Sequence, residues 1–156
     1  MTLFTYGAVM TATQPTSVVL DFSTIHLRLH ARLLWDLNPE LVEKFVETLP
    51  FQTIYSHTTA SGQGMYAPTK VVGKIPAQHQ LLTEMQPGTI TLSTDNYKTL
   101  GLFYGRITEP LPGFPPVAVV VEEDLEAMQI VGREVWLSNT VTHEPIVVTV
   151  TAGEQA

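Results

Sequence analysis

Residues 89–107, TITLSTDNYKTLGLFYGRI, contain two runs of strand character separated by a short polar stretch. In Thr89–Thr94 apolar side chains alternate with hydroxyl-bearing ones, which is the period-two pattern of a half-buried strand. Asp95 and Asn96 follow as turn residues, and Leu100–Ile107 then continues as a second apolar run. We therefore expect the two runs to pair as antiparallel strands.

Upstream, Thr24–Trp35 also alternates, with apolar residues on one face and four basic residues on the other, namely His26, Arg28, His30 and Arg32. An alternation of this length predicts a strand buried on one face. Asn38 then supplies a helix N-cap before Pro39, and apolar residues at helical spacing continue to Leu49. Residues 51–68 return to strand character around the turn Ser61-Gly62-Gln63-Gly64, which predicts a hairpin.

Downstream, Val117–Val121 is apolar without alternation and predicts a strand buried on both faces. Acidic residues at the start of Glu122–Val131 favour a second short helix, which Gly132 is expected to close. Glu134–Ser138 and Ile146–Thr151 are interpreted as the last two strands.

Many short strands and two brief helices favour a barrel or a sandwich over a parallel sheet. The predicted fold class is mainly β with two short helices, as a closed β-barrel of about eight strands. The chain has 156 residues, which suits a single domain. We assign residues 24–156 to the barrel and residues 1–23 to an N-terminal arm or edge strand.

Composition narrows the classes of partner. The net charge of −7 opposes binding to nucleic acid, and no window approaches the roughly 20 apolar residues of a membrane-spanning helix. The chain has no cysteine, and charged residues make up only 15% of it. These features predict a soluble, cytoplasmic protein that self-associates into a homo-oligomer.

The order of these elements resembles the small bacterial cyclophilin-like domains. The residues that carry the resemblance are Leu49-Pro50-Phe51, Met65-Tyr66-Ala67-Pro68, Gln86-Pro87-Gly88, Leu102-Phe103-Tyr104-Gly105-Arg106 and the acidic helix start near Asp124. The resemblance implies a cyclophilin-like barrel, distantly similar to domains of oxoprolinase-type and urea-amidolyase-type systems and to cucumopine or mikimopine synthases. It does not imply prolyl isomerase activity, because the isomerase motifs of true cyclophilins are missing from this sequence.

Three residues are the candidates for catalysis. Arg106 follows a glycine near the end of an apolar strand, and a guanidinium can hold a carboxylate through two hydrogen bonds. His57 is expected at the barrel rim beside Tyr66, where an imidazole can move a proton near neutral pH. Ordinary surface or core positions remain the alternative for each. The candidates for substrate binding are aromatic: Tyr55, Tyr97, Phe103 and Tyr104.

No phosphate-binding glycine loop and no convincing metal-ligand spacing occur in the sequence, so we expect neither cofactor nor metal. The leading hypothesis is an enzyme that uses general acid/base chemistry on a small substrate bearing a carboxylate, amide or imine. Cyclisation, isomerisation and hydrolysis all stay open, with a lyase, a cyclase or an isomerase as the enzyme class. The alternative is a noncatalytic binding or assembly module that accompanies a larger enzyme.

Overall fold

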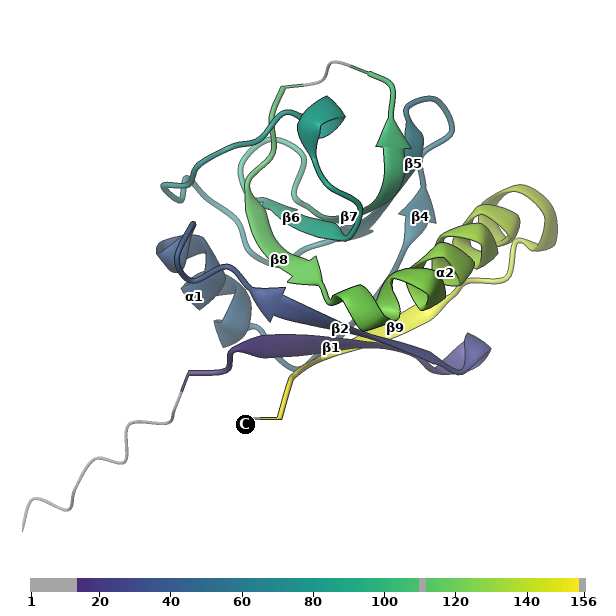
Figure 1. The fold of residues 1–156 in the computed structure, drawn as a ribbon, viewed down its shortest axis with the longest axis horizontal. Helices are drawn as coiled ribbons and strands as arrows, with labels where there is room; N and C mark the ends of the chain where they lie inside the picture. Colours follow the sequence, from purple (N-terminus) through teal and green to yellow (C-terminus); the bar gives the residue numbers. More distant parts are fainter. Residues whose placement is uncertain (1–13, 110–111, 155–156) are drawn as a thin grey trace, which may run out of the picture.

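The computed structural model describes residues 14–109 and 112–154. This part of the chain forms nine β-strands and two α-helices (Figure 1). The strands are β1 (Ser17–Phe22), β2 (Leu27–Leu33), β3 (Phe51–Ile54), β4 (Ser56–His57), β5 (Gly62–Pro68), β6 (Thr89–Ser93), β7 (Thr99–Ile107), β8 (Pro116–Val120) and β9 (Val147–Ala152). The helices α1 (Pro39–Glu47) and α2 (Leu125–Leu137) lie on opposite sides of the barrel.

The strands form one antiparallel sheet in the order β3-β9-β1-β2-β8-β6-β7-β5-β4. Its two ends, β3 and β4, are consecutive in the chain and are separated only by Tyr55. β3 pairs with β9 and β4 pairs with β5, so this single segment joins the two edges of the sheet. The predicted mainly β fold with two helices is confirmed, as a nearly closed barrel.

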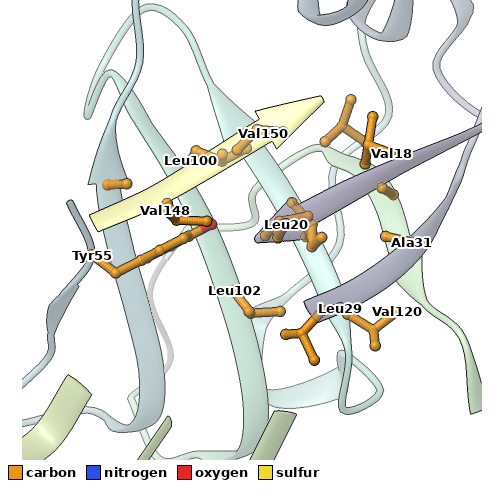
Figure 2. Packing of buried hydrophobic residues seen from close by; sticks show 14 of the residues in the cluster. Val18, Leu20, Leu29, Ala31, Tyr55, Leu100, Leu102, Val120, Val148 and Val150 are labelled. Carbon is orange, nitrogen blue, oxygen red and sulfur yellow. The ribbon is translucent and has the colours of Figure 1, made fainter. Parts of the chain in front are cut away.

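The barrel interior is filled by apolar side chains that alternate along each strand. In β1, Val18, Leu20 and Phe22 are all buried, whereas the residues between them are partly exposed. Figure 2 shows side chains from β1, β2, β7, β8 and β9 converging with Tyr55 on this interior. A smaller apolar cluster lies apart from it and consists of Leu82, Met85, Phe103, Ile107 and Phe114.

β1 occupies a position that the sequence analysis did not give it. Residues 1–23 were predicted to form an arm or an edge strand, and residues 1–13 lie outside the described part of the chain. Ser17–Phe22, however, pairs with β2 on one side and with β9 on the other, so it is an interior strand of the sheet. The barrel therefore begins before residue 24.

The C-terminal half of α2 also differs from prediction. Gly132 was expected to end the second helix, and Glu134–Ser138 was expected to form a strand. Instead α2 continues through Gly132 to Leu137, and a π-helical turn follows over Ser138–Thr142. Gly132 is buried against the ring of Tyr104, so its missing side chain serves packing and not helix termination.

Asn38 was predicted to cap α1, but its side chain forms no capping hydrogen bond. The side chain is buried, and its Nδ2 donates to the carbonyl oxygens of Gln78 and Pro116 at 3.1 and 2.8 Å. Its Oδ1 accepts from the backbone N–H of Gln78 at 2.7 Å. Asn38 thus ties the long segment before β6 to the start of β8.

The hydroxyl of Tyr55 is buried in the core without a hydrogen-bond partner among the described residues. A buried polar group left unpaired costs about 1–3 kcal/mol. We therefore expect Tyr55→Phe to raise the free energy of unfolding by about 1 kcal/mol, measured by urea denaturation. Tyr104→Phe is the matched control, because the Tyr104 hydroxyl has a partner, and it should lower stability. A loss of stability in Tyr55→Phe would contradict this account.

Candidate functional site

The strands β4, β5 and β7 present chemically different faces. Residues paired directly across neighbouring strands point to the same face of a sheet. His57 pairs with Met65, which pairs with Leu102, and these side chains face the barrel interior. Tyr66 pairs with Gly101 in the alternate positions and therefore faces outward. The register consequently separates His57 from Tyr66, which were expected to lie side by side.

On the inner face, His57 and Tyr104 form a buried pair. His57 Nε2 lies 2.6 Å from the Tyr104 hydroxyl, and His57 Nδ1 lies 2.6 Å from the carbonyl oxygen of Thr58. Because a carbonyl oxygen only accepts, Nδ1 carries the proton and Nε2 accepts from Tyr104. Trp136 of α2 packs edge-on against the imidazole at a ring-centroid distance of 5.0 Å. This arrangement holds a neutral histidine whose two nitrogens are both bonded.

Burial lowers the pKa of His57, and the hydrogen bond to Thr58 offsets this only in part. Unfolded chains bind the proton near pH 6.5, at a higher pH than the native state does. The contribution of neutral His57 to the stability of the folded protein is therefore complete above about pH 6.5. It is lost as the pH falls toward the lowered native pKa. We expect the wild type to lose more stability than His57→Gln between pH 7.5 and 5.5, by denaturant titration.

His26→Asn is the matched control for this prediction. His26 is exposed and has a positive φ of 56°, a conformation that asparagine tolerates. Its replacement should leave the pH dependence of stability unchanged. Parallel pH profiles for the wild type and His57→Gln would show that His57 contributes nothing to it.

On the outer face, an open cleft of about 310 Å³ lies beside β5 and β7. The rings of Tyr66, Tyr97 and Phe114 line it, together with the Glu109 carboxylate and the Ser61 hydroxyl. Tyr66 packs edge-on against the buried Phe103 ring at 5.6 Å, and Tyr97 packs against Phe114 at 5.0 Å, between ring centroids. The volume is at the lower end of small-molecule pockets, roughly 300–1,000 Å³.

Glu109 is the single charged residue among those that line this cleft. Burial and the charge of Glu109 raise the pKa of the Tyr66 hydroxyl, and a hydrogen bond with Ser61 opposes them. Tyr66 therefore stays protonated at neutral pH and can donate, whereas the Glu109 carboxylate can accept a proton or hold a cation. The cleft therefore combines aromatic surface with the Tyr66 hydroxyl as a donor and the Glu109 carboxylate as an anionic acceptor.

The structure groups the predicted residues as follows. Tyr66 and Tyr97 line the cleft, and Phe103 lies beneath Tyr66. His57 and Tyr104 form the interior pair, while Tyr55 lies in the core. Arg106 is exposed near the end of β7, does not line the cleft, and forms no ion pair with a described residue.

Two residues of the cleft, Glu109 and Phe114, were not identified from the sequence. Both lie in the proline-rich segment between β7 and β8, which was interpreted only as a surface loop. Phe114 is held in place by paired backbone hydrogen bonds with Gln80, each 2.9 Å long. An aromatic residue flanked by Gly113 and Pro115 in a proline-rich loop was the available signal.

Within residues 14–109 and 112–154, no group of three or more potential ligands is arranged to hold a metal ion. Over the same residues no helix is long and apolar enough to cross a membrane.

The sheet order and its closure through Tyr55 form a nearly closed antiparallel barrel, and the likeness to McbB supports a cyclophilin-like fold. McbB, whose structure was determined in complex with tryptophan, has this fold at a TM-score of 0.80 and is 29% identical to this chain. The match covers 89% of this chain and 45% of McbB, so the chain spans less than half of that protein. The hypothetical protein AF2241 from Archaeoglobus fulgidus matches at a TM-score of 0.60 and 15% identity, over 89% of this chain and 95% of its own. No family model and no curated protein matches the sequence.

Proposed function

We propose that this protein is a cofactor-independent enzyme for a small aromatic substrate that bears an amino or imino group. The substrate binds in the cleft of Tyr66, Tyr97, Phe114 and Glu109. The observation that carries the proposal is the pairing of aromatic walls with a single carboxylate in one cleft. The likeness to McbB, which binds tryptophan, supports a ligand of this size and chemistry.

The chemistry follows from two polar groups of the cleft, Glu109 and the Tyr66 hydroxyl. Glu109 pairs with an ammonium group or accepts a proton, and Tyr66 donates a proton to a developing anion or to an imine nitrogen. In imine hydrolysis, Tyr66 protonates the imine nitrogen, and water adds to the carbon as Glu109 takes its proton. Glu109 then gives this proton to the nitrogen, the hydroxyl proton of the intermediate returns to Tyr66, and the C–N bond breaks to give a carbonyl and an amine. None of these reaction steps requires an oxidation or a reduction.

The charge of the ligand distinguishes this proposal from the anionic or amide ligand predicted with Arg106 as its anchor. We expect tryptamine to bind at least tenfold more tightly than indole-3-propionate in isothermal titration calorimetry. Glu109→Gln should remove this preference, because it removes the charge that pairs with the ammonium group. A tenfold change in affinity corresponds to about 1.4 kcal/mol of binding free energy. Glu126→Gln, an exposed acid on α2, is the matched control and should bind as the wild type does.

Indole-3-propionate binding more tightly than tryptamine, with that binding lost in Arg106→Ala, would overturn the proposal in favour of the anionic ligand. Tryptophan carries both charged groups and reports on their joint effect. The comparison of the three ligands therefore shows whether the site prefers a positively or a negatively charged ligand.

Catalysis is tested separately from binding. We expect the wild type to accelerate hydrolysis of N-benzylidene benzylamine, followed by the benzaldehyde absorbance. Tyr66→Phe should lower this rate about 100-fold while changing tryptamine affinity less than twofold. Binding without turnover in the wild type would instead favour the noncatalytic module, an alternative that the limited coverage of McbB also supports.

Membership in the small bacterial cyclophilin-like family, a cytoplasmic location and assembly into a homo-oligomer remain predictions. So does the absence of a metal or cofactor. The residues of the cleft belong to one chain, so the proposed site does not require the homo-oligomer.

A further inference from the structure

A second cavity of about 290 Å³ adjoins the cleft but has a different lining. It lies between the turn that joins β6 to β7, the loop that carries His79, and the segment around Gly113. Tyr97 and Phe114 line both cavities, so their packed rings separate one from the other. The proposed function makes no use of this second cavity.

Among the residues that line the second cavity, Asp95 is the acidic one, and it lies beside the hydroxyl-bearing Ser93 and Thr94. Asp95 contributes a carboxylate, and its Oδ1 already accepts from the Asn96 backbone N–H at 2.9 Å. His79 Nδ1 lies 3.1 Å from the Ala77 carbonyl oxygen, so in the neutral imidazole Nδ1 carries the proton and Nε2 can accept. No lysine or arginine is among the described residues that line the cavity.

We propose that this second cavity binds a guanidinium group. A guanidinium is planar, permanently charged and carries five N–H donors, so it can bond the Asp95 carboxylate and His79 Nε2 together. It also stacks on aromatic faces, which the Tyr97–Phe114 pair supplies. An ammonium group is a point charge without this planar surface and matches the lining less well. The inference stands independently of the proposed function, because it uses neither Glu109 nor Tyr66.

The test is a titration of the full chain with methylguanidinium, methylammonium and acetate at equal ionic strength, followed by amide NMR shifts. We expect methylguanidinium to shift the signals of Asn96 and Gly113 and to bind more tightly than methylammonium. Acetate should cause no shift at these positions. Asp95→Asn keeps the shape of the side chain and should weaken methylguanidinium binding at least tenfold.

Glu109→Gln is the control that separates the two cavities, and it should change methylguanidinium affinity less than twofold. The proposal is overturned if Asp95→Asn binds methylguanidinium as the wild type does, or if acetate binds preferentially. It is also overturned if the shifts follow Glu109→Gln, since the cation would then occupy the cleft. Native NMR spectra of both variants establish that they fold.

Discussion

Gly132→Ala is expected to destabilise the protein by at least about 2 kcal/mol, although alanine is normally the better helix former by about 1 kcal/mol. A Cβ at residue 132 would lie 2.4–2.6 Å from three ring carbons of Tyr104. The ring has little freedom to move, because its hydroxyl bonds His57 on the inner face of β4. The added methyl group must therefore push α2 away from the barrel or displace the ring.

A double-mutant cycle by urea denaturation identifies the cause. In a Tyr104→Leu background the ring is gone, so Gly132→Ala should become neutral or stabilising. Arg133→Ala, an exposed position in the same helix, should change stability by less than about 0.5 kcal/mol. If Gly132→Ala is tolerated in the wild-type background, close packing of α2 on Tyr104 is disproved.

Asn38→Ala is expected to cost roughly 2–4 kcal/mol, because it removes three hydrogen bonds at a buried site. The backbone groups of Gln78 and the carbonyl oxygen of Pro116 would lose their partner. Amide hydrogen exchange should quicken at Gln78 and Gln80, which lie in the segment that Asn38 holds. Because Gln80 bonds Phe114, the same change should weaken ligand binding in both cavities.

Asn139→Ala provides the matched control for this prediction. The side chain of Asn139 also forms a hydrogen bond, to the His57 backbone N–H at 3.2 Å, but Asn139 is exposed. Its replacement should cost less than about 1 kcal/mol. Equal losses in Asn38→Ala and Asn139→Ala would mean that burial of Asn38 adds nothing to its contribution.

The sequence predicted those elements whose signals are local. The pairing of β6 with β7 followed from two alternating runs around Asp95-Asn96, and α1 followed from proline and apolar spacing. β1 carried the same alternation in Ser17–Phe22 but was interpreted as an arm or an edge strand, although its apolar residues face the core. The end of α2 was wrong because the reason for Gly132 lies in Tyr104, a distant residue that contacts it only after folding.

The candidate site was predicted in part for the same reason. Tyr66 and Tyr97 were named from the sequence and do share one cleft. Glu109 was missed because the sequence of a proline-rich loop does not show which face of the sheet the loop will cover. The separation of His57 from Tyr66 depends on strand register, and register is a property of paired strands that a single segment does not reveal.

Closure through Tyr55 also fixes the length of the segment that joins the two sheet edges. Along residues 51–57 the odd-numbered side chains turn inward and the even-numbered ones turn outward without interruption. Inserting or deleting one residue here would invert this alternation for one half of the segment and bring Ser56 or Thr58 inside in place of His57. In homologous barrels we therefore expect the length of this segment to differ by an even number of residues, because only such a change keeps the inward and outward alternation.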